Sequence, residues 1–285
     1  MIFSSRFWGT LVISALLPCF SAAAQGLADG DRYAKRLQNP LGGGIQYQGL
    51  SSSESQVRSF TIPVVLPLEA NLGRLNLGSS LEYKRQEIRT ADDTNIQEGP
   101  SYISLDSRFR AFRSNRFKLE ILESLNVPIA RNTEETVPRE LQFNAGGYVL
   151  DSGVSFSYFL RRATLKLGVE HNLRLARDDF NPGESVSAEV SLAYGFGGYG
   201  DYQDRRPFNL LIGFTSRYHY ADRLNREEIQ GTEFGTVFLA PGLQYYGSSL
   251  SLWATVEVPI HRTKIEEDGY QDKVRGNIGV KYYFR

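Results

Sequence analysis

Apolar and polar side chains alternate residue by residue along most of this chain. In the segment 75–84, leucine and tyrosine dominate the odd positions, whereas asparagine, glycine, serine, glutamate and lysine occupy the even ones. The same two-residue period recurs at 102–111, 165–175, 186–192, 208–214 and 250–258. Successive side chains of a strand point to opposite faces, so this period predicts β-strands with one apolar and one polar face. Helical periodicity is absent from the sequence.

The predicted strands are long for a soluble protein. Their alternating stretches cover about 10 to 14 residues, whereas soluble strands have about 5 to 6 and tilted membrane strands about 9 to 11. Aromatic residues collect near the strand ends, as at Tyr83, Tyr102, Tyr194, Phe196, Tyr218, Tyr220, Tyr245 and Tyr246. Membrane interfaces favour such aromatic residues. We therefore expect an all-β, transmembrane, antiparallel up-and-down β-barrel; a soluble β-sandwich, whose strands also alternate, is the remaining structural alternative.

Long and short connections follow one another, as outer loops and periplasmic turns do in bacterial barrels. The long ones are predicted at 90–97, 130–139, 221–231 and 262–272, and the short ones near Ala70 and at 114–115, 161–162 and 246–249. The connection at 197–206 breaks this alternation mildly, and the one at 177–183 is of moderate length. Between 141 and 160 the apolar positions change from odd to even. Either Asp151, Ser152 and Gly153 form a hairpin turn, or they form a bulge that flips the face of one long strand. We favour the bulge, because it leaves about 12 strands and bacterial barrels have an even number.

The N-terminus has the features of a secretory signal peptide. Arg6 supplies positive charge, the segment 11–17 is apolar, and the small residues at 22–24 suit cleavage after Ala24. The predicted organisation is a cleaved signal at 1–24, a periplasmic N-terminal segment at 25–41 and a barrel at 42–285. A lipoprotein signal would use Cys19, but Pro18 stands where such a site needs a small residue. Cys19 is the only cysteine in the sequence and leaves with the signal, which excludes disulfides and thiol chemistry.

Charge is balanced, with 32 basic and 32 acidic residues, so nothing favours nucleic acid as a partner. The last strand, at 274–284, resembles the C-terminal recognition signal of outer-membrane barrels, although Arg285 follows the terminal aromatic Phe284. We accordingly expect the outer membrane of a Gram-negative bacterium as the location. The expected partners are outer-membrane lipid, a small-molecule solute and, through the C-terminal strand, the barrel-assembly machinery.

The predicted inner face carries charges of both signs. Its candidate pore-lining residues are Glu82, Lys84, Asp106, Arg108, Arg110, Lys118, Glu120, Lys166, Glu170, Arg174, Glu189, Arg217, Glu257, Arg275 and Lys281. Such residues line a hydrated path and tune its selectivity, or else pair with one another and plug it. A barrel of about twelve strands is larger than barrels whose interior is filled by side chains and smaller than those that enclose an aqueous channel. The strand number therefore does not show whether the interior is open or plugged.

Three histidines are the only candidates for general-base chemistry. His171 lies at an apolar position of its strand, His219 lies between two tyrosines, and His261 shares the polar parity of Glu257. A rim enzyme would need one of them beside a nucleophile or an acid, and no serine stands in a recognisable nucleophile motif. We predict no catalytic residue.

Two further patterns, the acidic pairs and a glycine-rich segment, are predicted to be structural rather than ligand-binding. The acidic pairs at 92–93 and 178–179 lack the spacing of a calcium loop and are predicted to be solvated loop charge. Glycines at 195, 197 and 200 match a dinucleotide fingerprint only formally, because a turn follows where the motif needs a helix. No metal or cofactor is predicted.

The segment 237–284 resembles the transporter-like outer-membrane family associated with phenol-degradation pathways. The resemblance rests on Pro-Gly-Leu-Gln-Tyr at 241–245, a strand closing on Val258 and Pro259, a polar loop, and Gly-Val-x-Tyr-x-Phe at 279–284. It implies a barrel that takes up small hydrophobic or aromatic compounds, and it transfers no site residues. The predicted function is an outer-membrane channel or facilitator for small solutes. The alternatives are a rim enzyme acting on lipid or peptide and a closed structural or adhesive barrel.

Overall fold

The computed structural model describes residues 39–51, 55–65, 70–72, 74–90, 94–129, 147–176, 179–196, 207–247, 250–264 and 271–284. The predicted signal peptide, most of the predicted periplasmic segment and the acidic pair at 92–93 lie outside these ranges and stay predictions. Within the described ranges, no helix has the length and apolar character that a bilayer crossing requires.

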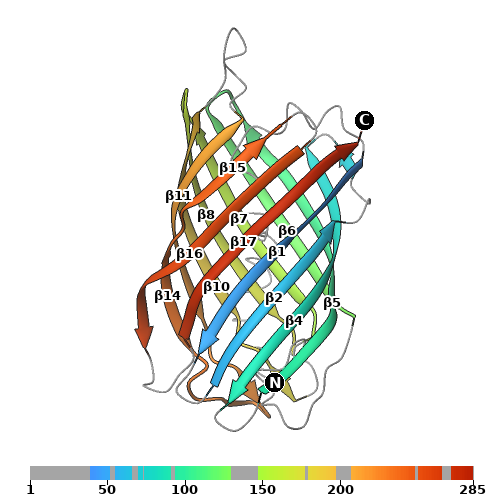
Figure 1. Ribbon diagram of the computed structural model, residues 1–285, viewed down its shortest axis with the longest axis vertical. Helices are drawn as coiled ribbons and strands as arrows, with labels where there is room; N and C mark the ends of the chain where they lie inside the picture. The colour runs from blue at the N-terminus through green and yellow to red at the C-terminus, as the bar shows by residue number, and fades with distance from the viewer. Residues whose placement is uncertain are drawn as a thin grey trace, which may run out of the picture.

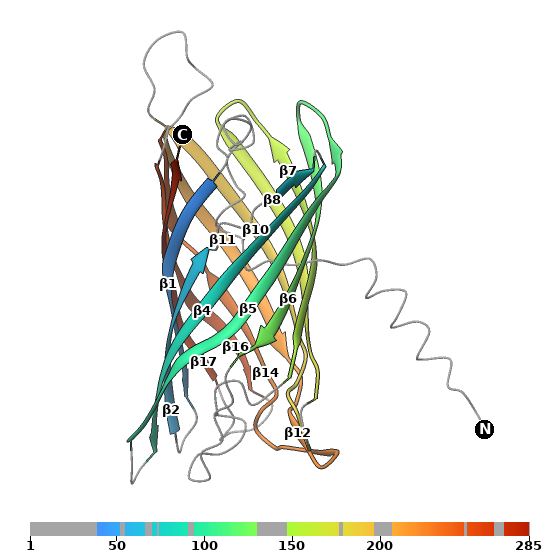
Figure 2. The ribbon, with the colours of Figure 1, turned by 90° about the vertical axis from the view of Figure 1, so that its right-hand side faces the viewer.

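The described strands form one closed antiparallel barrel (Figures 1 and 2). Its wall consists of β1 (Asn39–Ser51), β2 (Ser55–Val65) continued by β3 (Ala70–Leu72), β4 (Leu75–Thr90), β5 (Thr94–Arg113), β6 (Phe117–Pro128), β7 (Val149–Phe159), β8 (Ala163–Arg174), β10 (Ser185–Phe196), β11 (Phe208–His219), β14 (Phe234–Leu239) continued by β15 (Gly242–Tyr246), β16 (Leu250–Lys264) and β17 (Gln271–Phe284). Counting each continued strand once gives twelve strands among the described residues. The barrel closes where β1 pairs with β17, from Asn39 opposite Phe284 to Ser51 opposite Gln271. The predicted fold class is confirmed.

Strand alternation separates an apolar outer face from a polar inner face. In β11, Leu210 and Ile212 point outward and are 56% and 50% exposed, whereas Asn209 and Thr215 point inward and are 8% and 9% exposed. Exposed leucine, isoleucine, valine and phenylalanine side chains recur around the wall. A soluble sandwich would bury them, so their exposure on a closed barrel identifies the lipid-facing surface.

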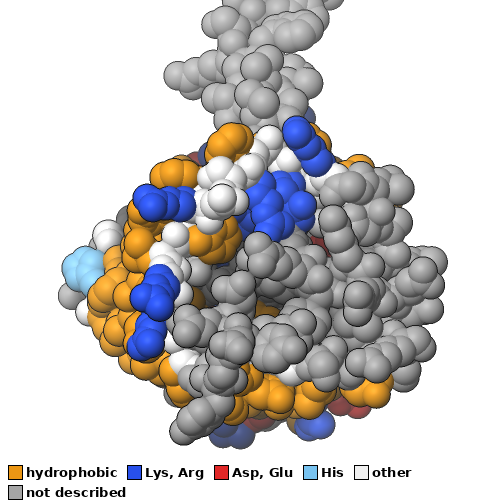
Figure 3. Space-filling model, turned by 90° about the horizontal axis from the view of Figure 1, so that it is seen from above, with side chains coloured by type: hydrophobic (Ala, Val, Ile, Leu, Met, Phe, Trp, Pro, Cys, Tyr) orange, Lys and Arg blue, Asp and Glu red, His pale blue; other side chains and the backbone are white. Residues whose placement is uncertain are grey.

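Aromatic rings surround the end of the barrel at which β17 ends. Phe208 contacts Phe196 and Tyr245, with ring centroids 5.7 and 5.1 Å apart, and Phe117 stacks on Tyr158 at 5.0 Å. These contacts form the interfacial girdle that the sequence predicts for several of its strand ends. Figure 3 views this end and shows Lys and Arg side chains along part of the rim, with hydrophobic side chains on the outer wall. The exposed arginines of the adjoining turns are Arg74, Arg113, Arg116, Arg161 and Arg162.

The structure corrects both interpretations of Asp151, Ser152 and Gly153. These residues lie inside β7, which pairs with β6 and β8 without a shift of register. They therefore form neither a hairpin turn nor a bulge. Leu150 and Val154 share the outer face with Ser152, so the even apolar parity of this strand extends through the supposed turn.

Three predicted long loops contain more strand than expected. Strands β4 and β5 extend to Thr90 and from Thr94, so most of the predicted loop at 90–97 is paired strand. Similarly, β16 continues to Lys264 and β17 begins at Gln271. The predicted loop at 221–231 contains the short strands β12 (Arg223–Leu224) and β13 (Glu227–Glu228).

The loop that carries β12 and β13 folds against the loop between β8 and β10. β12 pairs with β9 (Phe180–Asn181), which makes a small separate sheet at the end of the barrel opposite the C-terminus (Figure 2). The Asp222 carboxylate accepts the Gly183 N–H at 2.5 Å, and the Asp222 N–H donates to Thr232 Oγ1 at 2.8 Å. The first bond joins the two outer loops, and the second fixes Asp222 within its own loop.

Candidate functional site: the inner face of the barrel

Alternation places the candidate pore-lining residues on the inner face. This holds for Glu82, Lys84, Asp106, Arg108, Arg110, Lys118, Glu120, Lys166, Glu170, Arg174, Glu189, Arg217, Glu257 and Arg275. Lys281 pairs with Ser251 through its backbone, and its side chain lies outside the described residues. That these residues line an open path stays a prediction.

A hydrogen-bonded network crosses β5 to β8 on the inner face. Asp151 accepts from Asn126 Nδ2 at 2.5 Å and also from Asn172 Nδ2. Asn126 Oδ1 in turn accepts from Ser104 Oγ at 2.5 Å, and Arg174 Nε donates to Asn172 Oδ1 at 3.0 Å. Because every link joins neighbouring strands or nearby positions of one strand, the network stiffens this part of the wall.

Buried ion pairs hold several of the predicted charges against the wall. Lys118 Nζ lies 2.9 Å from Glu120 Oε2, and their side chains are only 9% and 6% exposed. Lys166 Nζ lies 3.1 Å from Glu189 Oε2. A lysine and a carboxylate at this depth need a partner, because unpaired burial of either charge is costly. Pairing thus neutralises these four inner charges locally.

A cluster around Phe238 occupies the inner face of β11, β14 and β17. Phe238 is fully buried, and the guanidinium carbons of Arg217 and Arg275 lie 5.9 and 5.2 Å from the centre of its ring. Both distances fall within the range of cation–π attraction. Arg275 also donates to the carboxylate of Asp272, which is itself fully buried. Two cations therefore flank one aromatic ring inside the barrel.

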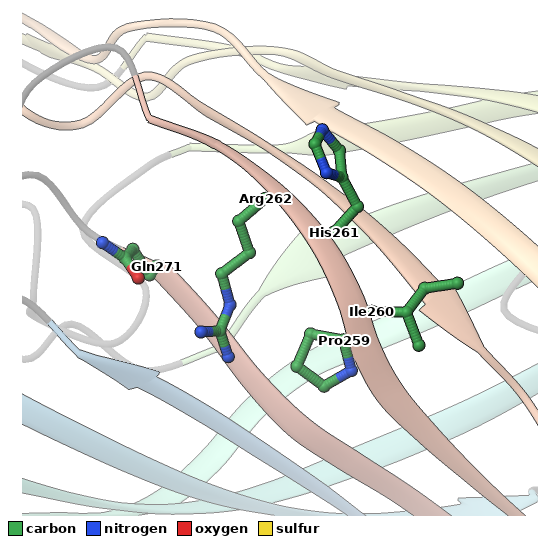
Figure 4. A pocket seen from close by; sticks show the side chains of 5 residues that line it. All are labelled: Pro259, Ile260, His261, Arg262 and Gln271. Carbon is green, nitrogen blue, oxygen red and sulfur yellow. The ribbon is translucent and has the colours of Figure 1, made fainter.

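A bulge in β16 reorders the side chains near its end. Val237 of β14 pairs with His261, but Phe238 pairs with Pro259, which leaves Ile260 as the extra residue. Bulges are among the few places where a strand tolerates proline. Figure 4 shows the five residues that line a hollow here, Pro259, Ile260, His261, Arg262 and Gln271; Ile260 and His261 lie on the opposite side of β16 from Pro259 and Arg262.

The prediction that His261 shares the face of Glu257 is therefore wrong. Glu257 faces inward, whereas His261 pairs with the outward-facing Val237. The intervening bulge adds one residue, and one residue is enough to exchange the two faces of a strand. Arg262 takes the inward place and donates from Nε to the backbone oxygen of Asp272 at 3.1 Å.

The other two histidines lie beside acids at the outer end of the barrel. His171 Nε2 is 2.8 Å from Glu184 Oε2, and His219 Nε2 is 3.2 Å from Asp222 Oδ1. Neither imidazole is hydrogen-bonded to a serine or threonine hydroxyl within the described part of the chain. Asp222 already accepts the Gly183 N–H, so its contact with His219 belongs to the structure that joins the outer loops.

Sequence reasoning missed three inner-face residues. Asp151 was assigned to a turn or bulge, although the parity of Leu150, Val154 and Phe156 marks its position as inward. Phe238 and Asp272 lack such a signal, because their burial depends on Arg217, Arg275 and the strands that bring them together. In the described ranges, no group of three or more His, Cys, Asp or Glu side chains is arranged to hold a metal ion.

Comparison with known proteins identifies the fold. No family model matches the chain, and no curated protein matches it in sequence. The COG4313 outer membrane channel from Pseudomonas putida F1 has a TM-score of 0.64 at 13% identity, over 86% of this chain and 96% of that one. The beta domain of the Bordetella autotransporter BrkA has a TM-score of 0.52 at 10% identity, over 87% and 100%.

These similarities confirm the prediction of an outer-membrane β-barrel. At such low identity they establish the fold alone, because one barrel architecture serves many functions. The function must therefore be inferred from the inner face of the barrel.

Proposed function

We propose that this protein is a channel or facilitator for small solutes across the outer membrane. One observation carries the proposal: a closed barrel with an apolar outer face has a mainly polar inner face, which carries charges of both signs on β4 to β8, β10, β11, β16 and β17. A polar interior is typical of barrels that hold a hydrated path. Solutes would pass the Lys166–Glu189 pair and the cluster around Phe238.

For the solute class, we propose small hydrophobic or aromatic compounds. The resemblance of 237–284 to transporter-like proteins of phenol-degradation pathways supports this class. Arg275 lies in that segment and Arg217 lies on the neighbouring strand β11; Phe238 between them is fully buried, so the two guanidinium groups are the parts of this cluster that a solute could meet. Aromatic rings stack favourably on guanidinium planes.

Single-channel conductance of the full-length mature chain in planar bilayers tests the channel. We expect steady conductance, and we expect Arg217→Glu to shift the reversal potential in a salt gradient towards cation selectivity. Arg223→Glu is the matched control, because Arg223 is 52% exposed in an outer loop and pairs with Glu228. A folded barrel without conductance would disprove the simple pore.

The two alternative functions give different results in the same preparation. A closed structural or adhesive barrel would fold, as shown by heat-modifiable gel mobility, and conduct nothing. A rim enzyme would lose hydrolysis of lipid or peptide on His171→Ala or His219→Ala, whereas a channel would keep its conductance in both variants. The neighbouring acids Glu184 and Asp222 are the observation that keeps this alternative open.

A further inference from the structure

Five arginines lie in three successive turns at the end of the barrel where β17 ends. Arg74 lies between β3 and β4, Arg113 and Arg116 flank the turn between β5 and β6, and Arg161 and Arg162 form the turn between β7 and β8. All five are exposed. Figure 3 shows basic side chains gathered along part of this rim. We call these five residues the arginine rim.

The described parts of these three turns contain no aspartate or glutamate. Arg74, Arg116 and Arg162 make no side-chain hydrogen bond or ion pair with any residue that the structure describes. Near the opposite end of the barrel, by contrast, Arg89 and Arg223 pair with glutamates of their own strand or loop. The arginine rim therefore presents positive charge to its surroundings.

The arginine rim lies directly beside outward-facing apolar side chains. Phe117, next to Arg116, is 39% exposed, and Leu160, next to Arg161, is 51% exposed. Phe117 also stacks on Tyr158, which makes it part of the aromatic girdle. Because an aromatic girdle marks the level at which hydrocarbon meets the polar headgroups, the adjoining arginines lie at headgroup level.

Hydrogen bonds hold the backbones of two neighbouring turns close together. In the turn between β5 and β6, the Ser114 N–H donates to the backbone oxygen of Phe117 at 2.8 Å, and Ser114 Oγ accepts the Phe117 N–H at 3.0 Å. The Phe159 N–H, just before the next turn, donates to the backbone oxygen of Arg116 at 2.7 Å. Because neighbouring strands lie about 4.8 Å apart, side chains from both turns can contact one ligand.

We propose that the arginine rim binds the headgroups of anionic phospholipids in the leaflet that faces the periplasm. Short turns lie on the periplasmic side of outer-membrane barrels. A guanidinium offers a planar set of donors that suits a phosphate group, and clustered basic residues beside a membrane attract anionic lipid. The bound headgroup supplies the negative charge that the described turns lack. The inference does not depend on the proposed channel function.

Tryptophan quenching by brominated lipid measures which phospholipid lies beside the arginine rim. In the full-length mature chain with Phe117→Trp, a lipid-facing tryptophan lies next to Arg116, whereas the natural Trp253 packs on Gly279 at the inner face. The probes are phosphatidylcholine vesicles that contain brominated phosphatidylglycerol or brominated phosphatidylcholine. We expect the brominated phosphatidylglycerol to be enriched roughly fivefold over the brominated phosphatidylcholine, which is the effect of one basic residue near an anionic surface.

Leu252→Trp is the matched control position for this measurement. Leu252 is 42% exposed on the outer face of β16, close to a turn whose residues 247–249 include no basic side chain. A tryptophan there should be quenched equally by the two brominated lipids. An equal preference for phosphatidylglycerol at both positions would show a general attraction to the barrel, and it would contradict a site at the rim.

Removal of the charge should remove the lipid preference at Phe117→Trp. The triple change Arg116→Gln, Arg161→Gln and Arg162→Gln keeps polar side chains on both turns, and we expect it to bring the enrichment close to one. Arg223→Gln is the matched control, because it removes an arginine that is 52% exposed in an outer loop, and it should leave the enrichment unchanged. Sodium chloride at about 1 M should also abolish the preference, because salt screens exposed charges.

A second measurement covers poor folding of the tryptophan variants. Electron paramagnetic resonance of trace spin-labelled phosphatidylglycerol or phosphatidylcholine, in vesicles that hold the otherwise unchanged chain, reports the fraction of each lipid that the barrel immobilises. We expect a larger immobilised fraction of phosphatidylglycerol for the wild type and equal fractions for the triple variant.

Three further results would overturn the proposal. Equal quenching by the two brominated lipids in a folded Phe117→Trp protein would show that no anionic lipid collects at the rim. A preference that survives the triple change would place the lipid site elsewhere on the barrel. A preference that millimolar inorganic phosphate abolishes at constant ionic strength would assign the arginines to a soluble anion.

Discussion

The indole ring of Trp253 occupies the space that a side chain at Gly279 would need. The two residues pair across β16 and β17, and a β-carbon built on Gly279 would lie 1.9 Å from Cζ2 of the ring. Gly279 is buried on the inner face, so the ring covers the backbone of the last strand. Glycine at this position thus allows the Trp253 ring to pack closely on β17, the strand that closes the barrel with β1.

Gly279→Ala should destabilise the barrel. The new methyl group would force the ring off its position, and overpacking of this kind costs about 1–3 kcal/mol. The free energy of unfolding in urea, measured in lipid vesicles, checks this expectation. Gly78→Ala is the matched control, because a β-carbon on Gly78 would meet no atom within 4 Å. Equal stability of the two variants would show that Trp253 moves at no cost.

The buried pair of Lys118 and Glu120 predicts an asymmetric response to mutation. Glu120→Gln leaves the Lys118 ammonium buried without its carboxylate, which should lower the free energy of unfolding by roughly 3 kcal/mol. The double variant Lys118→Met with Glu120→Gln removes both charges and should recover most of that loss. The same urea titration measures all three proteins. A double variant less stable than Glu120→Gln would contradict the mechanism.

Removal of the Phe238 ring should widen the barrel interior and lower the stability of the barrel. Phe238→Ala deletes a fully buried ring, which costs about 3–5 kcal/mol where the cavity does not collapse. It also leaves Arg217 and Arg275 without the ring between them. We expect a higher single-channel conductance and a lower unfolding temperature. Phe238→Leu, which keeps most of the volume, should stay close to the wild type in conductance.

Asp222 should control the order of the outer loops without affecting the barrel. Asp222→Ala leaves the buried Gly183 N–H without its acceptor, a loss of about 1–3 kcal/mol that acts locally. Limited proteolysis of intact cells should then cut the loops faster, while the heat-modifiable mobility of the barrel is kept. Glu228→Ala, an exposed change in the same loop, is the control. Unchanged cleavage of Asp222→Ala would show that other contacts hold the loops.

Much of the barrel wall was predictable because strand alternation is a local property. The apolar positions of 208–214 and 250–258 mark the outer face in the sequence and in the structure alike. The fifteen candidate pore residues followed from the same parity. Two positions do not follow from alternation. Asp151 lies in an ordinary strand although its neighbours have the composition of a turn. His261 lies on the outer face because a bulge exchanges the two faces of β16.

The sequence by itself determined the fold class, the two faces and the approximate strand number, because a two-residue period needs only neighbouring residues. Only the tertiary structure decided which positions stand opposite one another. Phe238 between Arg217 and Arg275 and the pairing of the outer loops through Asp222 both join residues from different strands or loops. Register between strands depends on the turns and bulges of the whole barrel, and no single segment encodes it.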